Sequence, residues 1–241
     1  MLTAAFLVTV LILTQSRGGW IAAALVLPAC VLVLLRGRWR LAATILLIGG
    51  VVTAAAWVAL ARPDALDPLI LGPQQDPSPG MSLENLSGRF EVWSRAIYGI
   101  QDFPFTGMGM NAFRRVVPVL YPLFSIDPTT DIGHAHNAFL QAALDLGIPG
   151  LIAYLSVHIS AFAMLVSSWR RRGKLPFPEP LSRALILGLG GGLAAHLIYG
   201  LTDAVALGAK PGVLWWMLLG LVASLYRVPS LRPARKEAVR A

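Results

Sequence analysis

The chain has 241 residues, of which 56% are hydrophobic and 13% are charged, whereas roughly 25% of the residues of a soluble domain are charged. The formal net charge of +8 does not indicate a nucleic-acid-binding protein, because the basic residues form short clusters between apolar runs and no basic face with interleaved aromatic residues. The single cysteine, Cys30, excludes an internal disulfide. The composition therefore predicts an all-α integral membrane protein.

Six apolar runs have the composition of membrane-spanning helices. A helix of about 20 apolar residues spans the hydrocarbon of a bilayer, where a chain must satisfy all its backbone hydrogen bonds internally. We predict about six transmembrane helices, at residues 1–15, 18–35, 41–61, 148–169, 183–202 and 211–226. The chain then divides into three transmembrane helices (1–61), one large loop (62–147), three further transmembrane helices (148–226) and a basic tail (227–241). Because residue 1 already lies in an apolar run, we expect further helices upstream.

The distribution of basic residues predicts how these helices are oriented. Thirteen of the 20 Lys and Arg residues fall in three clusters, which follow the second, the fourth and the sixth predicted helix. Strict alternation of six helices places all three clusters on one side of the membrane, and the positive-inside rule identifies that side as the cytoplasm. The large loop is therefore expected to be extracytoplasmic.

A first short helix is predicted within the loop, after a Pro- and Asp-rich stretch that excludes regular helix. Its apolar residues Phe90, Trp93, Ile97 and Ile100 recur at spacings of three and four, which places them on one helix face. An amphipathic helix of this kind is expected to lie at the membrane surface, over the bundle.

A second short helix is predicted at residues 137–146. Asn137 is a good N-cap residue, and Gly147 suits the left-handed position that ends a helix, with Pro149 just beyond it. This helix also has an apolar side, so the loop is expected to contain two short amphipathic helices.

Two arginines are candidate anion-binding residues. Arg17 lies in the motif SRGGW between two apolar runs; it is either a functional charge at membrane depth or an interfacial anchor, and position alone does not decide. Arg89 is predicted at the centre of an apolar helix face, aimed at the bundle, whereas Arg95 is predicted on the opposite face, solvated and paired with Glu91. A buried guanidinium requires an anionic partner, which is either a phosphate, bound as a fork, or the carboxylate of Asp203.

The motif GHAHN at residues 133–137 supplies the remaining candidates. His134 and His136 do not by themselves predict a metal site, because the sequence shows no further Cys, His or carboxylate set near them. A histidine at a helix start, facing a membrane cavity, suits general-base chemistry, although the pattern by itself favours a structural or capping role. Asn137, His134, Asp203 and Lys210 are candidate supporting residues.

The three motifs, in this order, resemble the bacterial O-antigen ligase and O-antigen polymerase superfamily of membrane glycosyltransferases. The ligase pattern is His followed by Asn, Ser or Gln, nine positions, and then Gly-x-x-Gly. His136 and Asn137, nine residues and the sequence GIPG at 147–150 fit it without a gap. The SRGGW motif, the helix around Arg89 and the sequence PFTGMG at 104–109 are also similar to the family, and the chain resembles its C-terminal half.

The resemblance implies a metal-independent, cofactor-free, inverting transfer at the inner membrane, with the active site facing the periplasm. The donor would be a glycan on undecaprenyl pyrophosphate, and the acceptor a lipid A–core sugar or a growing polysaccharide. By the family pattern, Arg17 and Arg89 would hold the pyrophosphate and His136 would activate the acceptor hydroxyl.

Other functions are also compatible with this sequence. Within the superfamily, a polymerase of O-antigen or exopolysaccharide and a protein O-oligosaccharyltransferase differ from the ligase only in their acceptors. A transporter of bicarbonate or another solute belongs to a different class and needs polar groups near the bilayer midplane, often at broken helices. The glycine-rich segment 188–192 and His196 are the features that favour it.

Overall fold

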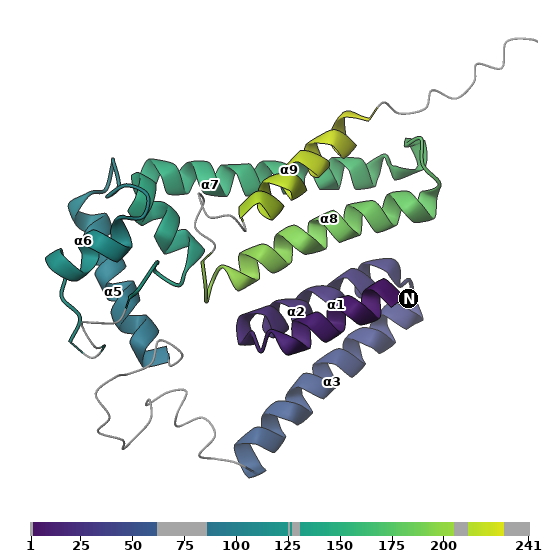
Figure 1. Cartoon of the computed structure of the whole chain (residues 1–241). Coiled ribbons are helices and arrows are strands. Elements are labelled where there is room, and N and C mark those ends of the chain that lie inside the picture. The colour runs from purple at the N-terminus through teal and green to yellow at the C-terminus, as the bar shows by residue number, and fades with distance from the viewer. Residues whose placement is uncertain (1, 62–85, 125, 127–130, 205–211, 229–241) are drawn as a thin grey trace, which may run out of the picture.

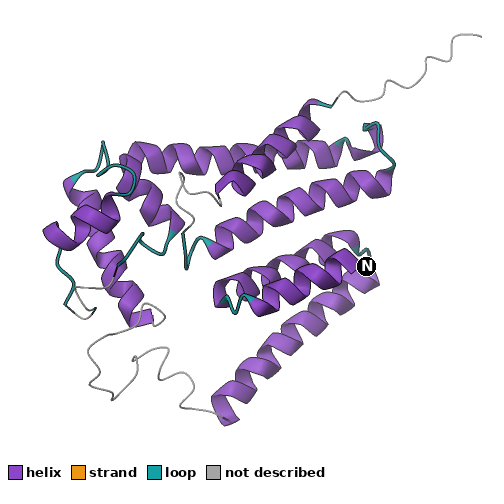
Figure 2. Ribbon diagram, in the orientation of Figure 1, coloured by secondary structure: helices purple, strands orange, loops and turns teal. Residues whose placement is uncertain are grey.

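The computed structural model describes residues 2–61, 86–124, 126, 131–204 and 212–228, and every regular element in these ranges is helical (Figure 2). The elements are α1 (Leu2–Leu13), α2 (Arg17–Leu34), α3 (Arg38–Ala61), α5 (Leu86–Asp102), α6 (Ala112–Leu120), α7 (Ala138–Arg170), the short 3-10 turn η2 (Arg172–Lys174), α8 (Glu179–Tyr199) and α9 (Gly212–Arg227). The all-α fold class is therefore confirmed.

The described helices include three, α2, α7 and α8, that are long and apolar enough to cross a membrane, while α1 and α9 are shorter apolar helices. Their apolar side chains face outward: Leu25 of α2 is 57% exposed and Ile159 of α7 is 68% exposed. Extended exposed apolar surface is typical of a surface that contacts lipid. The protein is a helical membrane protein, while the count of six spans and the division at residues 61, 147 and 226 stay predictions.

The helices form one bundle with a small helical cap at one end (Figure 1). Helices α7, α8 and α9 pack around a core that contains Leu193, Trp215 and Val222, and α2 lies along α8. Helices α5 and α6 pack against the first turns of α7 around a second core. The described part of the loop is thus tied to the bundle through α7.

Helices α2 and α8 approach each other closely at glycines. A Cβ atom at Gly18 would lie 2.8 Å from Thr202 Oγ1. A Cβ atom at Gly191 would lie 3.2 Å from Cys30 Sγ and from Val26 Cγ1. Small residues at a helix interface let two backbones approach, and here they bring the first turn of α2 against the end of α8.

The predicted helix at 137–146 and the predicted span at 148–169 form one element, α7, which is kinked at Gly147. Asn137 caps the helix, because its Oδ1 accepts hydrogen bonds at 3.0 Å from the N–H groups two and three residues later. Gly147 has a left-handed backbone, with φ of 72°. The predictions for Asn137 and Gly147 are therefore confirmed.

The PFTGMG segment, residues 104–109, binds the backbone of α7 just before this kink. The N–H groups of Met108 and Gly109 donate to the carbonyls of Leu144 (2.7 Å) and Asp145 (3.1 Å). These carbonyls lie where α7 is interrupted, so the segment supplies donors that the kinked helix lacks. It thereby locks the end of α5 to the first turns of α7.

The prediction for the buried face of α5 holds for Ile100, which packs against the second core, but is wrong for Phe90 and Ile97. Val92 and Ala96 are fully buried, whereas Phe90 is 60% and Ile97 43% exposed. The physical reason is close packing: a Cβ atom at Gly99 would lie 2.6 Å from a side-chain carbon of α7, so the face with small residues, and not the face with aromatic residues, contacts α7.

Arg95 is also not solvated as predicted. Its side chain is only 12% exposed, although the expected ion pair with Glu91 is present at 3.4 Å. Its Nε donates to the carbonyl of Pro122 at 2.8 Å, and its guanidinium lies 5.2 Å from the centre of the Phe124 ring. Arg95 therefore anchors the segment that follows α6.

The α2–α3 and α7–α8 connections, which carry two of the predicted basic clusters, lie at the end of the bundle opposite α5 and α6 (Figure 1). Arg171 of the α7–α8 connection donates to the carbonyl of Val228, just after α9, at 3.4 Å. Arg172 lies 3.7 Å from Glu179 at the start of α8. The position of these two connections at one end of the bundle agrees with the alternation that the charge distribution predicts, while most of the third cluster lies outside the described residues.

Two features that favoured a transporter have structural explanations in the bundle. Helix α8 continues without a break through residues 188–192, so these glycines create close packing and no broken helix. His196 stacks on His158 and on Trp215, with ring centres 5.9 Å and 6.1 Å apart, and its Nε2 lies 3.4 Å from the Tyr154 hydroxyl. These contacts with the core of the bundle are typical of a structural histidine.

Candidate active site

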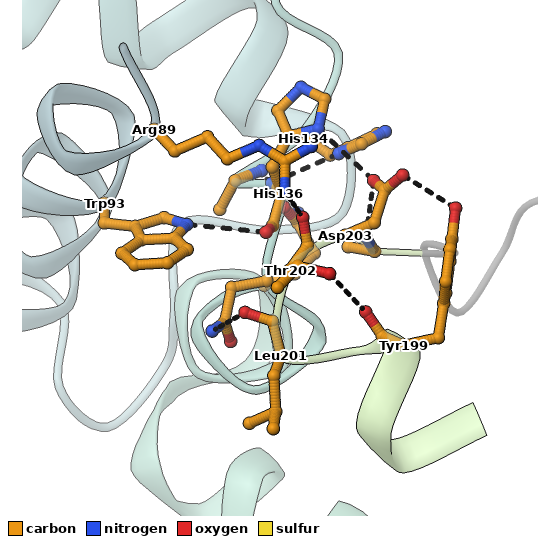
Figure 3. Close-up of polar contacts among 12 residues, drawn as sticks. Arg89, Trp93, His134, His136, Tyr199, Leu201, Thr202 and Asp203 are labelled. Carbon is orange, nitrogen blue, oxygen red and sulfur yellow. Dashed lines mark hydrogen bonds and ion pairs between the residues drawn. The ribbon is translucent and has the colours of Figure 1, made fainter. Parts of the chain in front are cut away.

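Two short segments meet at the end of the bundle beside α5: residues 133–137, which lead into α7, and residues 200–204, which follow α8 (Figure 3). Asn137 Nδ2 donates to the carbonyl of Leu201 at 3.0 Å. The first N–H of α7 donates to the carbonyl of Gly200 at 2.7 Å. Asn137 therefore both caps α7 and joins the two segments.

A carboxylate orients the imidazole of His136. Its Nδ1 lies 3.2 Å from Asp203 Oδ1. The other carboxylate oxygen of Asp203 accepts a hydrogen bond from the Tyr199 hydroxyl at 2.7 Å. With Nδ1–H donating to the carboxylate, Nε2 is the nitrogen that is left to accept a proton; the network assigns this tautomer.

Asp203 is held in its ionised form. Burial raises the pKa of Asp203, but hydrogen bonds from His136, from Tyr199 and from the Ala204 N–H outweigh burial and hold this pKa well below its usual range. The folded site therefore presents a carboxylate to His136 throughout the neutral pH range.

The backbone of His136 is left-handed, with φ of 47°, which is uncommon for a residue with a side chain. Its N–H donates to His134 Nδ1 at 3.2 Å, and its carbonyl accepts from Trp93 Nε1 of α5 at 3.4 Å. Surrounding contacts must hold a conformation of this kind, and here they come from His134 in the same segment and from Trp93 of α5.

His134 lies against His136, with 4.3 Å between the two ring centres. The sequence leaves open whether both rings enter one site, and the structure places them together. Burial, followed by the charge of His136, lowers the pKa of His134. The hydrogen bond between these residues requires a neutral His134, because His134 Nδ1 must accept from the His136 N–H.

Arg89 points toward the bundle, as predicted, and reaches the segment that follows α8, but from the edge of the buried face of α5 and not from its centre. One of its terminal nitrogens donates to the carbonyl of Thr202, the residue before Asp203 (Figure 3). The side chain is half-buried. Arg89 therefore brings a positive charge within a residue of the His136–Asp203 pair.

Arg17 is the first residue of α2, and its side chain is exposed. Ser16 caps the helix by accepting from the Gly19 N–H at 3.2 Å. Because Gly18 packs against Thr202, the start of α2 lies at the same end of the bundle as Arg89 and His136. Lys210, the remaining supporting candidate, lies outside the described residues.

One group in the described residues has the spacing of a metal site. The ligand atoms of His134, His136 and Asp203 all lie within 4.8 Å of one another, and imidazole and carboxylate are ordinary zinc ligands. His136 Nδ1 and Asp203 Oδ1 already bond each other, and His134 Nδ1 accepts from the His136 N–H. A metal ion bound through these two Nδ1 atoms would have to displace both contacts.

Sequence reasoning identified several members of the site but missed Tyr199 and the polar contact of Trp93. Tyr199 precedes Asp203 by four residues, a spacing that places two residues on one helix face, so this signal was present. Trp93 counted only as an apolar residue of the α5 face, and nothing in the sequence pairs its indole N–H with the carbonyl of His136.

The fold and this site define a class: a helical membrane protein that carries a histidine, a carboxylate and an arginine at one end of its bundle. Residues 2–155 match a family described as O-antigen ligase. The chain therefore belongs to the O-antigen ligase family, a family of membrane glycosyltransferases. A comparison with curated proteins found no match. The matched region includes Arg17, Arg89 and His136, whereas Asp203 lies beyond it.

Proposed function

We propose that the protein transfers a glycan from undecaprenyl pyrophosphate to an acceptor hydroxyl of lipid A–core, with inversion and without a metal ion, at the periplasmic face of the inner membrane. The observation that supports this most directly is the contact of His136 Nδ1 with Asp203 at 3.2 Å, beside Arg89. A base oriented by a carboxylate next to a guanidinium suits transfer from a phosphate leaving group.

His136 Nε2 serves as the general base in this proposal. The acceptor oxygen attacks the anomeric carbon as Nε2 takes the hydroxyl proton, and the bond between this carbon and the pyrophosphate oxygen breaks. Undecaprenyl pyrophosphate leaves with the electron pair. Asp203 stabilises the imidazolium that forms, because its carboxylate accepts from Nδ1–H.

Arg89 and Arg17 bind the pyrophosphate in this proposal. A guanidinium has five N–H donors in a planar fork, a geometry that suits the oxygens of a phosphate, and Arg89 contacts Thr202, next to Asp203. Pyrophosphate is a good leaving group when its charge is held by cations, which explains why a second acid is not required.

A polymerase is the alternative that uses the same site. The acceptor of a polymerase is the growing polysaccharide, and that of a protein O-oligosaccharyltransferase is a protein hydroxyl. A solute transporter remains a proposal of another class, although the unbroken α8 and the packing of His196 against Tyr154, His158 and Trp215 give it little support.

The test of this function is transfer by purified protein in liposomes. The liposomes contain an undecaprenyl-pyrophosphate-linked glycan and lipid A–core, and gel mobility reports the products. We expect glycan-modified lipid A–core. Longer lipid-linked chains would identify a polymerase instead, and uptake of labelled bicarbonate without any transfer would overturn the proposal.

Reporter fusions test the proposed orientation. Fusions at Arg38, Arg172 and Arg235 are expected to report the cytoplasm, and fusions at Pro77 and Gly208 the exterior, because the basic clusters are retained inside. Arg235, Pro77 and Gly208 lie outside the described residues. The side of the membrane on which these three segments lie is predicted from the charge distribution alone, and the fusions test it. A cytoplasmic signal at Pro77 contradicts a site that uses a donor outside the cytoplasm.

A further inference from the structure

Two buried polar side chains in the first turns of α7 have no part in the chemistry proposed above. Gln141 is 3% exposed and Asp145 is 2% exposed. Buried amides and carboxylates are costly unless they are hydrogen-bonded. The groups that contact these two side chains should therefore show why the protein buries them.

Gln141 connects Asp145 to the segment that carries the histidines. Its Oε1 accepts a hydrogen bond from the backbone N–H of Ala135 at 2.8 Å. Its Nε2 donates to Asp145 Oδ1, also at 2.8 Å. An N–H can only donate and a carboxylate can only accept, so these two partners fix which way the amide of Gln141 points.

The bond to Ala135 holds the peptide next to His136. Ala135 is fully buried, and His136 follows it with a left-handed backbone at φ of 47°. An unsupported non-glycine residue leaves this conformation readily. Gln141 therefore holds the position from which the imidazole of His136 reaches Asp203.

A hydrogen bond also holds the backbone of Asp145. Its carbonyl accepts from the N–H of Gly109 at 3.1 Å, in the segment that locks the end of α5 to α7. A continuous set of contacts therefore runs from Gly109 through Asp145 and Gln141 to Ala135. Ala135, Gln141 and Asp145 are all buried, so water cannot easily replace a bond that is lost among these three residues.

We infer that Gln141 and Asp145 are positioning residues for His136: they hold Ala135, and through it the left-handed turn that aims the imidazole at Asp203. This inference rests on the proposed function of His136. It predicts a specific kinetic effect, because a misplaced base slows the chemical step while the arginines still bind the donor.

Gln141→Met tests the bond to Ala135. Methionine has a similar length but offers no acceptor comparable to an amide oxygen, so the Ala135 N–H loses its partner. We expect kcat per folded protein to fall about 10–100-fold, the usual loss when a residue that orients a reactive group is removed. The KM for the undecaprenyl-pyrophosphate-linked glycan should stay within about twofold.

An exchange of the two side chains separates positioning from packing. Gln141→Glu alone sets two carboxylates against each other and is expected to lower kcat about 10–100-fold. The double variant Gln141→Glu, Asp145→Asn restores both bonds, because the new amide donates to the new carboxylate and that carboxylate still accepts from Ala135. We expect the double variant to recover kcat to within about threefold of wild type.

Leu144→Ala is the control for packing. Leu144 is fully buried on the same turns of α7, and its side chain has no part in the hydrogen bonds. Its removal should lower stability but leave kcat per folded protein within about threefold. If Leu144→Ala lowers kcat as much as Gln141→Met, or if the exchange fails to recover kcat, the positioning role is wrong.

His136→Ala distinguishes failure of this inference from failure of the proposed function. Loss of transfer in His136→Ala with wild-type kcat in Gln141→Met overturns the positioning role alone. Full activity in His136→Ala overturns the proposed base and the positioning role together. If Gln141→Met does not accumulate as folded protein, the comparison of Gln141→Glu with and without Asp145→Asn decides in the same way.

Discussion

His136→Ala is expected to lower the rate of glycan transfer about 10²–10⁴-fold, the usual loss when a general base is removed. Donor binding should persist, because Arg89 and Arg17 are unchanged. The measurement is transfer to lipid A–core in liposomes, together with binding of the undecaprenyl-pyrophosphate-linked glycan to the same protein. Transfer at the wild-type rate would show that His136 is not the base.

His134 provides the matched control, because it is the neighbouring histidine in the same segment. Its Nδ1 accepts from the His136 N–H, so its removal should disturb the turn without removing the base. We expect His134→Ala to lower transfer at most about tenfold, well short of the loss of a base. His134→Asn keeps an acceptor near that N–H and should lose less.

A chelator addresses the metal alternative directly. His134, His136 and Asp203 have the spacing of metal ligands, and His136→Ala would inactivate a metal enzyme as well. We expect transfer to persist unchanged in the presence of a chelator, because the imidazole accepts the proton without a metal ion. Abolition of transfer by the chelator, with recovery on adding zinc, would replace the general base with a metal site.

Arg89→Ala is expected to abolish transfer by weakening donor binding about 100-fold or more. A charged contact to phosphate in a shielded site is worth several kcal/mol, on the scale of about 3–4 for one preorganised donor to a developing charge. The side chain also donates to the carbonyl of Thr202, so its loss also removes one contact between α5 and the end of α8. Binding of the lipid-linked glycan must therefore be measured per folded protein.

Two arginines of the same region serve as controls for Arg89. Arg115 of α6 is exposed, so Arg115→Ala should leave binding and stability nearly unchanged. Arg95 anchors Pro122 and Glu91, so Arg95→Ala should lower stability while the folded protein retains donor binding. Equal losses of binding in Arg89→Ala and Arg95→Ala would show that α5 presents no specific phosphate site.

The site was only partly predictable from sequence. The cap of Asn137 and the left-handed Gly147 followed from short-range rules, because a cap and a helix end involve neighbouring residues. The buried face of α5 did not, because apolar side chains in a membrane protein contact lipid as readily as protein. Arg95 was misplaced for a different reason: the residues that cover it, Pro122 and Phe124, are far along the chain.

The sequence by itself determined the class of the protein: long apolar runs specify helices in lipid, since no other arrangement of a short segment satisfies the backbone there. It also identified Arg17, Arg89 and His136 as candidate residues of the active site. Only the tertiary structure decided that Asp203 contacts His136, because these two residues are 67 positions apart and meet only when α7 and α8 pack together. A contact that packing creates leaves no periodicity in the sequence, whereas a helix does.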